Sequence, residues 1–347
     1  MTPRGGKRRV GVIGTFVWDV IRGRDARRAP VEEWGGITYA LSAFDAALAA
    51  DWELVPLVKV GEDLAREARE FLRRLRRVAP DAHPIAVPYR NNRVELFYES
   101  AERRSEVLSG GVPGWSWLGL APLLHDLDAL YVNLISGFEL DLPTAQLLRQ
   151  QFGGPIYGDL HSLVLAVQPG GLRTYRPLPD VDAWCRCFDL LQVNEDELAM
   201  MAHDPMELAA TAMAAGVRSL VVTLGARGVV YFAAPGFDRL SDLAAARTAS
   251  FAAPPALRAP FSSRAAPQSA LAVRTQLVPA RISQVGDAAD PTGCGDVWGA
   301  TYFSRLLAGD IMSDALRAAI EAAARNVEHR GATGLAYHLR GELSPTT

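Results

Sequence analysis

The residues with the clearest chemical potential lie in one short run, Asp-Pro-Thr-Gly-Cys-Gly-Asp, at residues 290–296. An apolar pattern at helical spacing follows the run and ends at Gly309, so a helix is expected to start here. The first backbone N–H groups of a helix have no intrahelical partner, and the helix dipole adds partial positive charge. Gly293 and Gly295 let a ligand approach that backbone closely. The run therefore predicts an anion site, suited to a phosphoryl group as charge builds on its oxygens.

Asp296 directly follows the second glycine and adds a carboxylate to this anion site. A carboxylate in that place can accept a proton from an attacking hydroxyl group. Phosphoryl transfer needs little more than positioning, charge neutralisation and a metal ion. Asp at a helix start is also a common cap, and Gly-x-Gly is a common turn. The complete run, in a chain with an α/β pattern, favours the catalytic interpretation over the capping one.

The elements that must position this run follow an alternating pattern. Strand-like segments lie at residues 8–14, 52–61, 127–135, 155–160, 188–194 and 217–225, and helical segments at 37–50, 62–78, 143–152 and from 195. This alternation predicts an α/β fold with a doubly wound, mainly parallel sheet flanked by helices, in a single domain over residues 8–340. Residues 85–108 alternate in hydrophobicity and predict antiparallel strands exposed on one side.

Residues 233–278 interrupt the pattern with a long stretch rich in Ala, Pro and Ser. Two interpretations are open: a functional flap, or a surface insertion that the fold tolerates. The helix at 62–78 carries several arginines that lie mostly off its apolar stripe, as on a solvated face.

Composition narrows the class of protein. Among the 347 residues, 49% are hydrophobic and 22% charged, and the formal net charge is −3, which gives no reason to expect a nucleic-acid or membrane partner. No apolar run reaches membrane-spanning length and the basic start lacks a cleavage site, so we expect a soluble, cytoplasmic protein. The three cysteines are few and odd in number, as in a reducing compartment. Cys185-x-Cys187 fits ordinary packing better than zinc binding, because no second ligand pair is near in sequence.

The run at 290–296 resembles the carbohydrate kinase signature of the ribokinase-like (PfkB) family. This resemblance implies a ribokinase-like fold with a small β lid, and a kinase that uses ATP and Mg²⁺ to phosphorylate a hydroxymethyl group on a sugar or similar small alcohol. It implies that Asp296 is the general base and that Gly293, Cys294 and Gly295 supply the anion hole. A monovalent cation is a further cofactor that the resemblance leaves open.

Other segments resemble the family in the family's own order, from about residue 8 to 335. On the acceptor side, "GTFVWDVI" places Asp19, and "WGGITYALSAFDAAL" places Gly35 and Gly36, against the substrate. "VNEDELAMM" resembles the Asn-x-x-Glu motif and gives Asn194 and Glu197, of which Glu197 would hold Mg²⁺ through water.

On the nucleotide side, two segments resemble family elements near the cofactor. "VVTLGARGVVYF" gives Thr223, Gly225 and Gly228, and "ARNVEHRGATGL" gives Asn326 and Gly331 beside the adenine pocket. The segments at about 20–34 and 85–110 match the position of the family's lid. Such lids exclude water and in relatives often pair into homodimers.

Two departures from the family pattern bear on function. The family often has Asn four residues after the second glycine, where this chain has Ala40, so a contact to the sugar is missing. Cys294 replaces a commoner Ala, either as a reactive thiol at a helix start or as a small side chain that fits. Trp18 and Trp34 can stack on a sugar or base, or belong to the core. Asp159 and His161, which follow another strand, are weaker candidates for the site.

Three functions remain open at this point. The first is a sugar kinase, the second a nucleoside kinase of the same fold, and the third a catalytically silent ligand-binding protein, because fold does not fix function. The intact Asp296 and Glu197 speak against the silent protein. A Rossmann dehydrogenase is disfavoured because "GVIGTF" lacks the Gly-x-Gly-x-x-Gly spacing.

Overall fold

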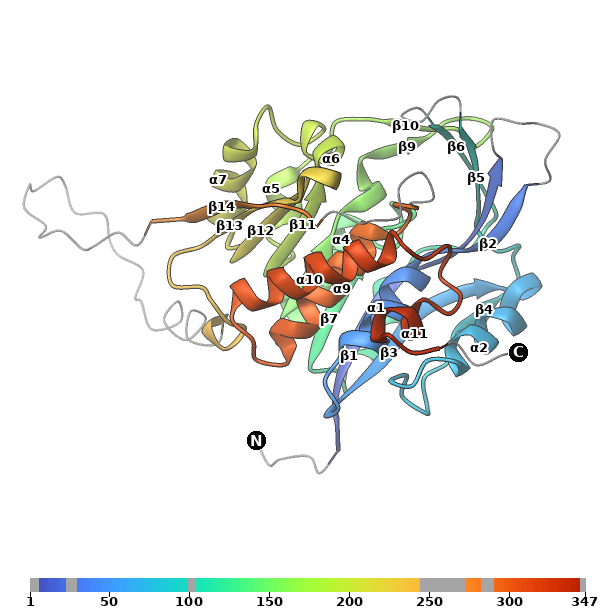
Figure 1. Ribbon diagram of the computed structural model, residues 1–347. Coiled ribbons are helices and arrows are strands. Elements are labelled where there is room, and N and C mark those ends of the chain that lie inside the picture. Colours follow the sequence, from blue (N-terminus) through green and yellow to red (C-terminus); the bar gives the residue numbers. More distant parts are fainter. Residues whose placement is uncertain (1–5, 23–29, 99–103, 244–271, 282–289, 344–347) are drawn as a thin grey trace, which may run out of the picture.

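The computed structural model describes residues 6–22, 30–98, 104–243, 272–281 and 290–343, and a 12-stranded sheet forms its centre (Figure 1). Neighbouring strands follow the order β14, β13, β12, β11, β8, β7, β1, β3, β4. Their bounds, from one edge to the other, are β14 Arg274–Val278, β13 Val229–Ala233, β12 Ser219–Thr223, β11 Leu190–Asn194, β8 Ile156–Asp159, β7 Ala129–Asn133, β1 Arg8–Arg22, β3 Trp52–Gly61 and β4 Ile85–Val87. The strands from β12 to β4 run parallel to one another. β13 pairs antiparallel with β12, and the edge strand β14 pairs antiparallel with β13.

Helices cover both faces of the sheet, and each face has its own apolar core. One face carries α1 Ile37–Ala47, α2 Ala65–Arg73, α9 Cys294–Leu307, α10 Met312–Asn326 and α11 Leu335–Arg340. The other carries α3 Trp117–Leu120, α4 Leu142–Gln151, α5 Val181–Cys185, α6 Glu195–Ala199 and α7 Pro205–Ala215. Because parallel strands need crossover connections, which helices supply, this arrangement confirms the predicted doubly wound α/β fold.

Short elements complete the described chain. They are the 3₁₀ helices η1 Glu62–Leu64, η2 Ala121–Leu123, η3 His161–Val164 and η4 Gly225–Arg227, and the two-stranded sheet of β9 Leu165–Val167 and β10 Arg173–Tyr175. The helix predicted at 62–78 is shorter than expected, since it begins with η1 and its α-helical part ends at Arg73.

Strand β1 is much longer than the predicted strand at 8–14, because its second half pairs with two further strands. From Phe16 onward it pairs antiparallel with β2 Val31–Gly36, and from Trp18 parallel with β5 Arg93–Tyr98. β5 pairs antiparallel with β6 Arg104–Ser109. The expectation of antiparallel strands throughout 85–108 holds for β5 with β6 and is wrong for β4, which adds to β3 in parallel.

Strands β2, β5 and β6 therefore form a small sheet beside the main one, where the lid segments at 20–34 and 85–110 were expected (Figure 1). Residues 23–29 and 99–103 of those segments lie outside the described residues. Of the stretch at 233–278, the last five residues form the edge strand β14, while 244–271 also lie outside the described part. Within the described ranges, no helix is both long and apolar enough to cross a membrane.

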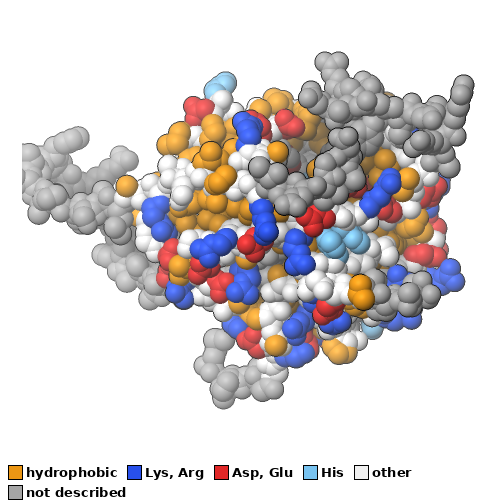
Figure 2. Space-filling view, in the orientation of Figure 1, with side chains coloured by type: hydrophobic (Ala, Val, Ile, Leu, Met, Phe, Trp, Pro, Cys, Tyr) orange, Lys and Arg blue, Asp and Glu red, His pale blue; other side chains and the backbone are white. Residues whose placement is uncertain are grey.

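The face drawn in Figure 2 carries both signs of charge. Lys and Arg side chains alternate there with Asp and Glu, and neither sign forms a continuous field. This mixed pattern agrees with the near-neutral charge of the sequence.

Candidate active site

The start of α9 is the structural centre of the site. Gly293 occupies the N-cap position with φ of 73°, a left-handed conformation that favours glycine. A Cβ on Gly293 would also collide with the ring of Tyr39, which packs directly on this backbone. Both constraints require glycine here and fix the direction in which the helix leaves the loop.

The backbone amides at this helix start are only partly free. The N–H groups of Gly293 and Gly295 have no hydrogen-bond partner within the described residues. The amide of Cys294 donates to the carbonyl of Pro291 at 3.1 Å. The turn at Pro291 thus uses the Cys294 amide in this structure, and its part in an anion hole stays a prediction.

Asp296 lies in the first turn of α9 with only 6% of its surface exposed. Its Oδ1 accepts a hydrogen bond from Asn133 Nδ2 at 2.6 Å. Burial raises the pKa of Asp296 to about 7, although the Asn133 amide lowers it. A carboxyl group with a pKa near neutrality is well matched to a general base, because both of its protonation states are accessible.

Two further carboxyl groups, Asp159 and Glu197, share this environment. Burial, with a smaller contribution from the charge of Asp296, raises the pKa of Glu197 to about 8, although the hydrogen bond from the Asn194 backbone lowers it. Burial also raises the pKa of Asp159 well above its ordinary value, with added contributions from the charges of Glu197 and Asp296. The three side chains therefore do not all ionise freely at neutral pH, as expected for carboxyl groups that a positive ligand would stabilise.

A Glu that only caps a helix start is usually exposed to solvent, whereas Glu197 is buried. It forms a reciprocal capping box with Asn194 at the start of α6. Its Oε2 accepts from the Asn194 backbone at 2.8 Å and its Oε1 from Asn194 Nδ2 at 2.5 Å. Both carboxylate oxygens thus have a protein donor, which agrees better with holding a metal through water than with direct ligation.

The predicted acceptor residues meet where β1 pairs with β2. Asp19 is buried, and a Cβ on Gly35 would collide with its carboxylate, so only glycine permits this approach. Gly36 is the N-cap of α1 with φ of 59°, and a Cβ there would lie 2.7 Å from the Thr15 carbonyl oxygen. The structure therefore brings Asp19, Gly35 and Gly36 together.

Four of the predicted nucleotide residues cluster at the carboxyl ends of two neighbouring strands. Asn194 ends β11 and lies in register with Thr223, which ends β12. Gly225 and Gly228 form the next turn, in which the Gly228 amide donates to the Gly225 carbonyl at 3.1 Å. In open α/β sheets, ligands bind in the crevice outside these strand ends.

Asn326 and Gly331 lie on the other side of α9. Asn326 ends α10, is fully buried, and donates through Nδ2 to the Thr292 carbonyl at 2.8 Å and to Cys294 Sγ at 3.2 Å. Gly331 lies against the carboxylate of Glu33. Asn326 thus ties the loop before α9 to α10. Its contact to a nucleotide, and that of Gly331, stay predictions.

The structure also places Cys294, Ala40 and the two tryptophans, for which the sequence allowed more than one role. Burial raises the pKa of the Cys294 thiol to about 11, which favours a fitting small side chain over a reactive thiol. Trp34 belongs to the core, with Trp18 packed edge-on against it. Ala40, at the place of the family's Asn, is fully buried inside α1 and offers no polar contact.

Three polar residues of the site were missed in the sequence. Asn133 and Gln192 contact the first turn of α9, and Tyr39 packs on Gly293 with a buried hydroxyl group that has no partner within the described residues. The signal for Asn133 was present, since it is a polar residue that closes an apolar strand, as Asn194 does. Tyr39 gave no signal, because an aromatic residue in an amphipathic helix usually belongs to the core.

No group of three His, Cys, Asp or Glu side chains within the described ranges is arranged to hold a metal ion by itself. Cys185 and Cys187 are buried free thiols of the apolar core beside α5, as ordinary packing predicts. Carboxylate oxygen is nevertheless the donor that Mg²⁺ takes, usually from one or two protein groups with water and phosphate completing its shell. Glu197, the residue predicted to hold Mg²⁺ through water, offers a carboxylate of this kind.

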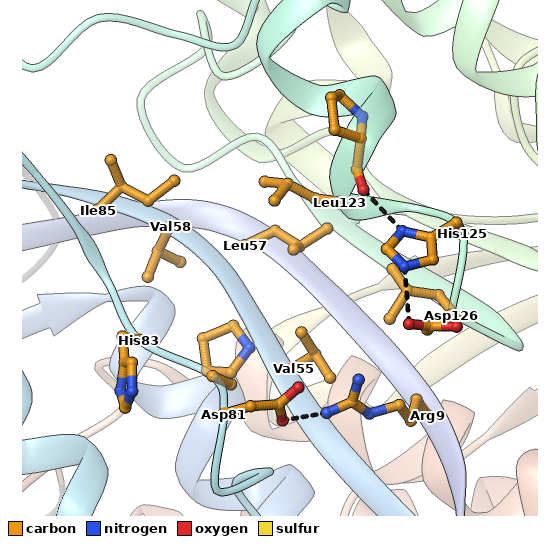
Figure 3. Close-up of a pocket in the computed structure, with 14 residues that line it drawn as sticks. Arg9, Val55, Leu57, Val58, Asp81, His83, Ile85, Leu123, His125 and Asp126 are labelled. Atoms are coloured by element: carbon orange, nitrogen blue, oxygen red, sulfur yellow. Dashed lines mark hydrogen bonds and ion pairs between the residues drawn. The ribbon is translucent and has the colours of Figure 1, made fainter.

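A separate cavity of about 260 Å³ lies away from these residues (Figure 3). It is lined from the amino-terminal part of β1 by Arg9 and from β3 by Val55 and Leu57, with His83 and His125 on its rim. The predicted site instead lies at the carboxyl ends of the parallel strands, where ligands of such sheets bind. The cavity contains none of the predicted site residues.

Comparison with known proteins identifies the fold. No family model and no curated protein matches the sequence. Among solved structures, a *Burkholderia thailandensis* nucleoside kinase bound to inosine superposes with a TM-score of 0.66 at 16% identity, over 94% of both chains. A pyrophosphate-dependent kinase of the ribokinase family gives 0.65 at 15% identity, over 93% of this chain and 96% of its own.

The *Thermotoga maritima* ribokinase gives a TM-score of 0.61 at 15% identity, over 96% of this chain and 98% of its own. Together with the sheet order and the two helical layers, these matches show that the chain has a ribokinase-like fold. At sequence identities this low, the matches show the fold only, and the activity must be argued from the site.

Proposed function

We propose that this protein is a small-molecule kinase of the ribokinase-like (PfkB) type, which transfers a phosphoryl group from ATP to a hydroxymethyl group. The observation that carries the proposal is the buried carboxyl group of Asp296 in the first turn of α9, beside the amides of Gly293 and Gly295, which have no hydrogen-bond partner among the described residues. A base and an anion site thus occur on the same helix turn. That combination is the minimum that phosphoryl transfer to an alcohol requires.

In the proposed mechanism, Asp19 binds hydroxyl groups of the acceptor and holds it against Gly35. Asp296 accepts the proton of the attacking hydroxyl group, for which its pKa near 7 is suited. The amides of Gly293 and Gly295 donate to the oxygens of the transferring phosphoryl group, and the dipole of α9 favours its negative charge. The small sheet of β2, β5 and β6 would cover the acceptor and exclude water.

ATP with Mg²⁺ supplies the phosphoryl group and neutralises part of its charge when bound. Asn194, Thr223, Gly225, Gly228, Asn326 and Gly331 would line the nucleotide side, and Glu197 would hold the metal ion through water. The strand-end positions of Asn194 and Thr223 support this assignment. A pyrophosphate-dependent kinase among the structural matches makes pyrophosphate the donor to test against ATP.

A nucleoside is the second candidate for the acceptor, and one observation favours it. Asp19 beside Gly35 suits the hydroxyl groups of a ribose as well as those of a free sugar. The structural match to a nucleoside kinase bound to inosine makes nucleosides the second group of acceptors to test.

The decisive experiment combines two donors, ATP and pyrophosphate, with separate pools of sugars, nucleosides and inositols in the presence of Mg²⁺. Phosphorylated product is detected by mass spectrometry, and Asp296→Asn serves as the matched control. We expect product with one donor and one acceptor pool, and none with the variant.

Thermal shifts with the same compounds separate the alternatives, since a ligand of the native state raises the unfolding temperature. Binding of nucleotide and acceptor without any product would support a catalytically silent ligand-binding protein. Product formation by Asp296→Asn at the wild-type rate would remove Asp296 as the base.

A further inference from the structure

Asn133, which no sequence motif singled out, makes the shortest side-chain contact to Asp296. It is the last residue of β7, and its Nδ2 donates to Asp296 Oδ1 at 2.6 Å. Asn133 has no exposed surface and Asp296 has 6%. A hydrogen bond to a charged group is strongest when both partners are shielded from water, so this contact restrains the carboxylate firmly.

A second contact from the sheet holds the same helix turn. Gln192 on β11 donates through Nε2 to the Gly295 carbonyl at 3.1 Å, and its Oε1 accepts from the Tyr157 hydroxyl at 2.6 Å. A Cβ on Gly299 would collide with Gln192 Oε1, so glycine at this place lets α9 approach the polar layer. Side chains from β7 and β11 therefore hold the first turn of α9 against the sheet. Of the two, the Asn133 amide contacts the Asp296 carboxylate itself.

Several titratable groups face Asp296 from the elements packed around it. They are Asp159 on β8, Glu197 on α6, Tyr131 on β7, Tyr39 on α1 and Cys294 on α9 itself. None of these groups carries a positive charge. Asn133 is thus the neutral donor that favours the ionised form of Asp296 in surroundings that otherwise oppose it.

We propose that Asn133 is a positioning residue, which orients the Asp296 carboxylate toward the acceptor hydroxyl. The catalytic consequence rests on the proposed kinase function, whereas the coupling between the two side chains does not. Loss of the donor would leave Asp296 free to rotate away from the acceptor, and misplacement of a reacting group by about 1 Å can cost about 10²-fold in rate.

The coupling is tested by urea unfolding of the wild type, Asn133→Leu, Asp296→Asn and the double variant, at pH 5 and pH 8. Leu retains the shape of Asn and removes the donor, and Asn133→Ala repeats the test without steric conflict. The loss in unfolding midpoint should be larger at pH 8, where Asp296 is ionised, than at pH 5. This pH-dependent part should vanish in the Asp296→Asn background.

Tyr302→Phe is the matched control, because it removes another buried hydrogen bond of α9, between the hydroxyl groups of Tyr302 and Ser219 at 3.2 Å, that does not involve Asp296. Its effect on the midpoint should be the same at both pH values. With an acceptor in hand, Asn133→Leu should lower kcat about 10²-fold with little change in KM. Its acidic pH limb should move to higher pH, while Tyr302→Phe retains kcat.

Equal losses for Asn133→Leu at both pH values and in both backgrounds would overturn the proposal, since they would show that Asn133 only fills space. Absence of wild-type turnover would contradict the kinase function and leave the stability cycle intact. The two failures are therefore distinguishable.

Discussion

Replacement of Asp296 by Asn should abolish turnover and at the same time stabilise the protein at alkaline pH. Burial raises the pKa of Asp296 from 3.8 to about 7. At 1.36 kcal/mol for each pKa unit, ionisation of this side chain destabilises the native state by at most about 4 kcal/mol. Asn has nearly the same shape and its Oδ1 can still accept from Asn133, so it removes the charge and little else.

The sign follows from linkage. Because the pKa of Asp296 is higher in the folded than in the unfolded chain, its contribution to stability is greatest below pH 4 and is lost as pH rises through about 7. The wild type should therefore lose stability between pH 5 and pH 8, and Asp296→Asn should lose less. Urea unfolding at both pH values measures the difference, and turnover should fall by about 10²–10⁴-fold, the contribution typical of a general base.

One combination of results would refute this reasoning. If Asp296→Asn lowers stability equally at pH 5 and pH 8, the carboxylate is a structural anchor and not a strained, poised base. Asp310→Asn provides a control for the removal of a negative charge. Asp310 forms an ion pair with Arg305 just beyond the end of α9, so this variant should be less stable than the wild type.

Four other predictions extend to the neighbours of Asp296. Turnover of the wild type should rise with pH through about 7, because Asp296 must be ionised; a flat profile from pH 5.5 to 8.5 contradicts this. Gly35→Ala should lower kcat/KM for the acceptor by about 10²-fold by displacing Asp19, with donor affinity unchanged in a binding assay. Tyr39→Phe should raise stability by about 1 kcal/mol in urea unfolding, since it removes a hydroxyl group buried without a partner in the described structure. Glu197→Gln should keep the backbone contact of the capping box, since a Gln amide oxygen can also accept from the Asn194 amide, and should raise the Mg²⁺ concentration needed for half-maximal turnover; unchanged metal dependence would remove Glu197 from the site.

Much of the fold could be predicted because its determinants are local. Buried parallel strands appear in the sequence as apolar runs, and helical periodicity after Gly293 and Gly295 predicts α9. The length of β1 could not be predicted, since its second half depends on pairing with β2 and β5, which are distant in sequence or shaped by turns. Parallel pairing of β4 with β3 was likewise invisible, because alternation reports exposure and not strand direction.

The positions of several candidate site residues could be predicted from motifs, while their roles stay predictions. Gly293 and Asp296 lie at the helix start that the apolar periodicity predicted, and Asp19 lies against Gly35, as the resemblance led us to expect. Asn133 carried a signal as the polar end of an apolar strand, but its contact with Asp296 could not be predicted, because the two residues are 163 positions apart. The hydrogen bond from the Cys294 amide to Pro291 could not be predicted either, since it depends on loop geometry that the motif does not encode.

The most direct test of the account is a single-turnover measurement of phosphoryl transfer with the acceptor that the screen identifies, comparing the wild type with Asp296→Asn at saturating donor and Mg²⁺. The account predicts a product that carries one added phosphoryl group on its hydroxymethyl oxygen, formed by the wild type and slowed at least about 10²-fold in the variant. Equal rates for the two proteins would contradict it, as would a wild type that binds donor and acceptor together and forms no product.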